Sequence, residues 1–213
     1  LVSLFPQASF ADAACSHNSI TDNERSGICK CNDCGKTLVR LSGYDVTTWA
    51  SLPKQYFETI DEAIAAVPEF DETYASSYYD VDGVLRWEYQ YSYEVRFYED
   101  IELDHDLVVK DKVFDLAPNP SGYMSKLSFT DGHSMRISRD KINDSNSVTL
   151  YQIHNIGNIT LEKNALVFLS ARPTIDKLTL ADKTADLRYM ANSWYTSEPQ
   201  LKIKKLEVTA QDC

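Results

Sequence analysis

The stretch from Ile159 to Phe168 contains the pattern that decides the fold: Ile159-Thr-Leu161, then Glu162-Lys-Asn-Ala165, then Leu166-Val-Phe168. Apolar residues stand two positions apart in the first and last of these three segments, and mostly polar residues separate the segments. A period of two is typical of a β-strand with one face buried. The stretch therefore predicts two short strands joined by a polar corner.

The same unit recurs along the chain from residue 101 onward. The paired segments are Ile101–Leu103 with Leu107–Val109, Leu127–Phe129 with Met135–Ile137, Ile159–Leu161 with Leu166–Phe168, Leu178–Leu180 with Leu187–Tyr189, and Leu201–Ile203 with Leu206–Val208. Short strands that recur between polar corners are what the stacked coils of a solenoid require. We therefore predict a mainly β fold with a degenerate β-solenoid over residues 101–213. A β-sandwich of short strands is the competing fold.

The region 41–100 is expected to contain one helix, over residues 56–67. Its apolar residues follow the helical spacing i, i+3, i+4 and i+7: Ile60, Ala63, Ile64 and Val67. Thr59 and Glu62 have the spacing of a capping box, and Pro68 helps to end the helix. A helix this short is marginal alone, so its apolar stripe must pack on another part of the chain.

A tyrosine-rich strand is expected to follow the helix. Residues 84–98 alternate strictly, and four rings share one face: Trp87, Tyr89, Tyr91 and Tyr93. A row of rings stacks on sugar faces or anchors a protein partner, so these four are the candidate ligand-binding residues. The alternative is that this face packs on the helix or caps the solenoid. Asp82-Gly83 is typical of a hairpin turn, which makes residues 74–81 the expected partner strand.

A separate module is expected over residues 15–40, because four of the five cysteines lie between Cys15 and Cys34. Cys15-x-His17 and Cys31-x-x-Cys34-Gly35 form two chelating pairs, and zinc takes four thiolate or imidazole ligands. We therefore predict a structural zinc ion held by Cys15, His17, Cys31 and Cys34, which would staple a segment too short for its own core.

Two alternatives remain open for this cysteine cluster. Extracellular proteins readily form disulfides among clustered cysteines, so disulfides compete with zinc. Cys29 is either a spare thiol or a substitute for Cys31.

Charge and terminal sequence bear on location and partners. A formal net charge of −11 disfavours nucleic acid and anionic membranes as partners. No segment approaches the ~20 apolar residues that cross a bilayer, so no direct membrane insertion is expected. Residues 1–14 have the apolar run and small-x-small triplet that end a signal peptide, which makes them a signal-peptide remnant or a plain extension. Strand patterning that continues to Ala210 favours truncation from a longer protein.

The succession of the helix at 57–67, the segment 93–103 and the segment 107–116, preceded by the Cys/His module, resembles a known family. It is similar to the right-handed parallel β-helix (pectate-lyase-like) domains of cell-surface proteins in Gram-positive gut bacteria. The resemblance implies a right-handed β-helix, a helix that caps the first coil, a zinc-knuckle-like module and a location outside the cell. It says little about activity.

These observations favour a non-enzymatic secreted or cell-surface module for adhesion or spacing. Its expected partners are glycans or a host or bacterial surface protein. The alternative is a polysaccharide-binding or polysaccharide-cleaving β-helix protein. Cleavage needs carboxylates that converge on one face. The residues to consider for it are Asp131, Asp140 and Asp144, with Arg136 and Arg139.

Overall fold

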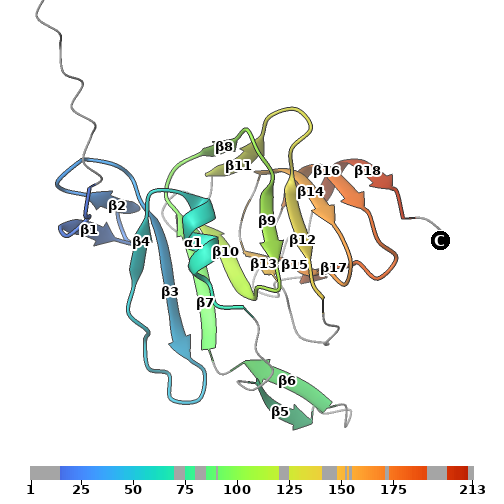
Figure 1. Cartoon of the computed structure of the whole chain (residues 1–213), viewed down its shortest axis with the longest axis horizontal. Helices are drawn as coiled ribbons and strands as arrows, with labels where there is room; N and C mark the ends of the chain where they lie inside the picture. The colour runs from blue at the N-terminus through green and yellow to red at the C-terminus, as the bar shows by residue number, and fades with distance from the viewer. Residues whose placement is uncertain are drawn as a thin grey trace, which may run out of the picture.

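The computed structural model describes residues 15–69, 75–79, 85–89, 91–119, 125–140, 148–151, 153, 155–170, 173–190 and 201–210. Over these residues the chain is mainly β, as the alternating pattern predicts, with a single described helix (Figure 1). No helix in the described ranges is both long and apolar enough to cross a membrane.

Two large sheets form the body of the molecule. The first contains β3 (Val39–Asp45), β4 (Gln55–Phe57), β7 (Tyr91–Phe97), β10 (Phe114–Pro118), β13 (Val148–Tyr151), β15 (Leu166–Ser170) and β17 (Asp186–Met190). The second contains β8 (Ile101–Leu103), β9 (Leu107–Lys110), β11 (Lys126–Phe129), β12 (Met135–Ser138), β14 (Asn155–Leu161), β16 (Thr174–Leu180) and β18 (Lys202–Val208). Two small hairpins complete the described strands, β1 (Ile20–Asn23) with β2 (Ile28–Cys31) and β5 (Ala75–Tyr79) with β6 (Leu85–Tyr89).

From β7 onward the chain passes back and forth between the two sheets, and the strands pair in parallel. The order β7-β10-β13-β15-β17 runs through the first sheet and β8-β11-β14-β16-β18 through the second. Among the described strands, antiparallel pairing occurs only between β1 and β2, β3 and β4, β3 and β7, and β5 and β6. The strands after residue 101 are therefore not joined as hairpins.

Residues that pair in register across neighbouring strands form ladders, and the apolar side chains of these ladders lie in the core. In the first sheet Val95, Leu116, Leu150 and Leu169 are neighbours in register and all are fully buried. In the second sheet Met135, Ile159 and Leu178 form an equivalent ladder. These ladders explain why the apolar pattern returns at every pass of the chain, since burial of apolar surface is the main favourable term in folding.

The expected pattern of strand pairs differs from the structure in three places. The last pair, 201–203 and 206–208, is one strand, β18, because Lys204 and Lys205 continue the extended chain and form no corner. The single strand expected over 84–98 is described as two strands in different sheets, β6 and β7. The buried strand β13 carries few alternating residues and was not predicted.

The helix α1 (Ile60–Ala66) has the predicted capping box, in which Thr59 accepts from the backbone of Glu62 and the Glu62 carboxylate accepts from the backbone of Thr59. It is shorter than the expected range because Tyr56 and Phe57 belong to β4. Its stripe is buried in the same core as the sheets and packs on β3, β4, β7 and β9.

The two strands β3 and β7 approach each other closely at Gly43. A side-chain Cβ at this position would lie 2.5 Å from the backbone oxygen of Ser92. Glycine is therefore required here, and it fixes the antiparallel register of β3 on β7.

Candidate metal centre

The cysteine module is built on the hairpin of β1 and β2. Cys31 ends β2, and its carbonyl oxygen accepts a hydrogen bond of 2.9 Å from the N–H of Gly35. The N–H of Cys31 donates in turn to the carbonyl of Lys36. Gly35 has a φ of 77°, in the left-handed region that glycine adopts without steric cost. This tight turn brings Cys34 back beside Cys31.

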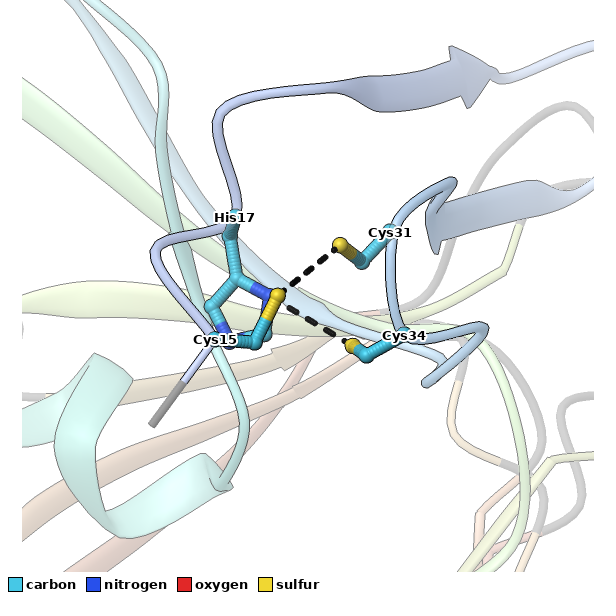
Figure 2. A group of neighbouring side chains, drawn as sticks. All are labelled: Cys15, His17, Cys31 and Cys34. Carbon is cyan, nitrogen blue, oxygen red and sulfur yellow. Dashed lines mark hydrogen bonds between the residues drawn. The ribbon is translucent and has the colours of Figure 1, made fainter. Parts of the chain in front are cut away.

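The predicted ligands lie together. The ligand atoms of Cys15, His17, Cys31 and Cys34 are all within 4.8 Å of one another. The sulfurs of Cys15 and Cys31 are 3.5 Å apart, and the Cys34 sulfur is 3.8 Å from Nδ1 of His17. Figure 2 shows the thiols of Cys31 and Cys34 pointing toward Cys15 and His17. These four residues could therefore hold a metal ion.

The spacing fits a small tetrahedral ion. With a metal–sulfur bond of about 2.3 Å, the sulfurs of a tetrahedral site are separated by about 3.8 Å. The 3.5 Å between the sulfurs of Cys15 and Cys31 is slightly below this value. A sulfur and a nitrogen bound to the same ion are separated by about 3.6 Å, because the metal–nitrogen bond is shorter, and the 3.8 Å between Cys34 and His17 is slightly above that distance. All four cysteines of the module are free thiols in the structure.

Glu58 orients the histidine of this cluster. Nε2 of His17 lies 2.9 Å from Oε1 of Glu58, while Nδ1 faces the Cys34 sulfur. A histidine that donates from Nε2 to a carboxylate keeps the lone pair of Nδ1 for a metal, and such carboxylates accompany most metal-binding histidines. The other oxygen of Glu58 accepts a 2.5 Å hydrogen bond from Lys36. Sequence reasoning missed Glu58 because its role depends on a contact across 41 positions.

Proton affinities differ sharply within the cluster. Contact with His17, followed by the backbone N–H groups of Cys34 and Asp33, lowers the pKa of Cys31 to about 6. The backbone N–H of His17 lowers the pKa of Cys15, but burial and the nearby thiols outweigh it and raise that pKa to about 11. Contact with Cys31 and then with Glu58 raises the pKa of His17. Cys31 is thus readier than Cys15 to bind as a thiolate.

Cys29 lies outside the cluster. It is buried in a small apolar core with Cys31, Leu38 and Tyr98. Burial raises the pKa of its thiol to about 11. Cys29 is therefore a packing residue and does not substitute for Cys31.

A buried ion-pair network ties the module to the body. Arg40, on β3, is only 3% exposed, and its guanidinium donates to Asp22 and Glu24 of the module and to Glu94 of β7. The second oxygen of Asp22 accepts from Lys54 at 2.7 Å. Because both Arg40 and Asp22 are removed from water, each needs the other's charge.

The aromatic residues singled out in the sequence lie on two strands. Trp87 and Tyr89 belong to β6, and their side chains lie outside the described residues. Tyr91 and Tyr93 belong to β7, with ring centroids 6.4 Å apart, and Tyr93 packs partly against the main core. Their role in ligand binding stays a prediction.

A different aromatic pair is exposed and was not anticipated. Tyr44 and Trp49 stack at the loop between β3 and β4, with ring centroids 5.4 Å apart and planes inclined by 10°. The only sequence signal was an isolated tryptophan beside polar residues.

Two of the residues considered for polysaccharide cleavage form ion pairs with neighbouring strands. Asp140 pairs with Lys110 at 2.8 Å, and Arg136 pairs with Asp106 and Glu162. Arg139 is buried and Asp131 is exposed, while Asp144 lies outside the described residues. Asp140 and Arg136 thus link neighbouring passes of the chain.

Comparison of the chain with protein-family models, with curated proteins and with solved structures found no match.

Proposed function

We propose that this chain is a non-enzymatic, secreted or cell-surface module for adhesion or spacing, in which a structural zinc ion fixes an N-terminal knuckle onto a right-handed parallel β-helix. The observation that carries the zinc part of the proposal is the cluster of four ligand atoms within 4.8 Å of one another. The adhesion and spacing part rests on the family resemblance. The partners proposed for it are glycans or a surface protein.

Zinc is the metal that best matches the donor set. Three thiols and one imidazole are soft ligands of the kind found in structural zinc sites, whereas calcium and magnesium prefer oxygen. The protein fills all four positions of a tetrahedral ion, which leaves none for a substrate. The His17–Glu58 contact supports the same conclusion, because a fixed imidazole ring is expected in a metal site.

The right-handed β-helix is proposed on the parallel pairing of the two sheets. A chain that leaves one parallel strand and returns to pair beside it makes a right-handed connection in nearly all known cases. An experimental structure that places the passes in a left-handed sense would contradict this part of the proposal.

The surface location is proposed on the signal-like residues 1–14 and on the family resemblance. Protease shaving of intact cells that naturally make the protein tests it. The protein is expected among the released peptides, and its recovery only after lysis would contradict the location.

Metal analysis of the purified protein tests the zinc centre. We expect one zinc per chain by elemental mass spectrometry, retained in Cys29→Ser and lost in Cys31→Ser. Absence of metal, together with cysteines oxidised in pairs, would establish the disulfide alternative.

Polysaccharide binding is the second candidate function. The exposed Tyr44–Trp49 pair favours it, because flat exposed rings are the surfaces on which sugar rings stack. Polysaccharide cleavage has no comparable observation in its favour.

A further inference from the structure

The loop between β3 and β4 holds Trp49 in an unusual position. The backbone of Trp49 has a φ of 59°, in the left-handed region that side chains other than glycine, asparagine and aspartate rarely adopt. Trp49 as a whole residue is 74% exposed. A strained backbone and a large apolar side chain in water are both unfavourable. Such a combination points to a function at this residue.

Backbone and side-chain hydrogen bonds close the loop that presents the ring. The carboxylate of Asp45 accepts from the backbone N–H groups of Thr47 and Thr48 at 2.8 and 2.9 Å. The backbone of Asp45 is bonded in both directions, since its carbonyl accepts from Trp49 and its N–H donates to Ala50. Because these bonds fix the loop before any ligand arrives, binding on it costs little ordering entropy.

Among the described residues, Tyr44 is the one ring that stacks on the indole of Trp49. The ring of Tyr44 covers one face of the indole in a nearly parallel stack, and Tyr44 is itself 37% exposed. Tyr44 therefore sets the plane of Trp49 and leaves a flat apolar surface toward solvent, with the exposed residues Thr47 and Thr48 beside it.

We infer that the Tyr44–Trp49 pair is a stacking platform for a pyranose ring of a neutral oligosaccharide. A pyranose has one face of C–H groups that fits a flat ring and hydroxyls at its edge that match polar neighbours such as Thr47 and Thr48. This inference names the ligand class for the adhesion part of the proposed function and rests on it, but it does not involve the metal.

Other ligand classes fit the platform less well. A quaternary ammonium group is held between several ring faces that converge, whereas Tyr44 and Trp49 are nearly parallel and stack on each other. A protein partner needs about 800 Å² on each side. The exposed residues around Trp49, from Thr47 to Ser51, are otherwise small or polar.

The platform and the knuckle lie at opposite ends of β3, as Figure 1 shows by the positions of the β3–β4 loop and of β1 and β2. Changes at the platform are therefore expected to leave the metal centre intact. This separation makes the two proposals testable on the same sample.

The test uses the whole chain, ¹⁵N-labelled, titrated with cellohexaose, xylohexaose, mannohexaose, maltohexaose and chitohexaose. At least one of these is expected to shift the indole N–H resonance of Trp49. Trp49→Ala should weaken binding of that sugar by at least tenfold, and Trp49→Phe by less. Trp49→Asn, which tolerates the left-handed backbone, should behave like Trp49→Ala.

Tyr151→Ala is the matched control, because Tyr151 is a 37% exposed aromatic on β13, and its binding should equal that of the wild type. Zinc content is measured on every sample. If no sugar of the panel shifts the Trp49 resonance, or if Trp49→Ala binds as tightly as the wild type, the inference is overturned. A zinc-free but sugar-binding protein would overturn the proposed metal centre alone.

Discussion

The knuckle (residues 15–38) and the parallel sheets (β7 to β18) are stabilised by different kinds of interaction. The buried core of the knuckle consists of Cys29, Cys31, Leu38 and Tyr98, with Cys15, Ile20 and Tyr56 packed against it. The parallel sheets share one continuous apolar core. A segment of this size cannot bury enough apolar surface to fold alone, whereas the stacked strands can.

The two regions therefore differ in the substitutions that they tolerate. In the sheets the apolar ladders tolerate different side chains, provided that each pass delivers an apolar residue to the right position. In the knuckle the four ligand atoms would all be needed to hold a metal, and the buried charge of Asp22 depends on Arg40 and Lys54, so single polar substitutions matter more there.

Removal of the metal should have the largest effect on the difference in stability between the knuckle and the sheets. Treatment of the zinc-loaded protein with a strong chelator is expected to unfold the knuckle and leave the sheets folded, since small structural zinc modules depend on the ion for folding. Hydrogen exchange measures this at the N–H groups of Cys31 and Leu38, which donate to Lys36 and Cys29. Protection that is unchanged in the knuckle, or lost equally in both regions, would contradict it.

A cavity in the ladders should destabilise the sheets and leave the zinc content of the knuckle unchanged. Ile159→Ala removes a fully buried side chain between Met135 and Leu178, and we expect a loss of about 4 kcal/mol in the free energy of unfolding. Urea denaturation measures it. Val108→Ala, at a side chain that is 61% exposed, is the control and should change stability by less than about 0.5 kcal/mol. Zinc content should be unchanged in both variants.

Loss of the buried Arg40 guanidinium should weaken the attachment of the knuckle to the sheets and lower the free energy of unfolding. Arg40→Met leaves the charge of Asp22 buried with Lys54 as its remaining cation, and we expect a loss of about 3 kcal/mol in unfolding free energy. The double variant Arg40→Met with Asp22→Asn should recover part of that loss. If the double variant is as unstable as the sum of the two single variants, the pair is not coupled.

Substitution of Glu58, the carboxylate beside His17, should have the smallest effect of the four changes. Glu58→Gln is expected to lower zinc affinity by about 10- to 100-fold, because the imidazole loses its charged acceptor. Competition with a chromophoric chelator measures the affinity. Glu102→Gln is the control, at an exposed carboxylate of β8. Equal affinity of Glu58→Gln and wild type would show that Glu58 only binds Lys36.

Local sequence predicted the parts of the fold that depend on local rules. The capping box of Thr59 and Glu62 and the alternation at Ile101–Leu103 use neighbours in the chain, and both are confirmed. The strand β13 was missed because its residues are buried on both faces, so that no alternation marks them. The break between β6 and β7 was missed because alternation alone does not reveal which partner a strand chooses.

The candidate site shows the same limit. The spacing of Cys15, His17, Cys31 and Cys34 was sufficient to predict that they meet, because chelating pairs close over short loops. Glu58 and Arg40 act through contacts between distant segments, and nothing in their neighbouring residues marks them.

The end of the first sheet at β3 and β4 has a consequence for self-association. A stack of parallel strands offers an open edge at each end, and open edges recruit other chains into fibres. Here β3 covers the edge of β7 in the opposite direction, with Gly43 fixing its register, and the short β4 ends the sheet. β4 is antiparallel to β3 and therefore runs in the direction of β7, so strand direction does not protect this edge. The edge is instead short, because β4 has only 3 residues, and a short edge strand offers few unpaired backbone groups to another chain.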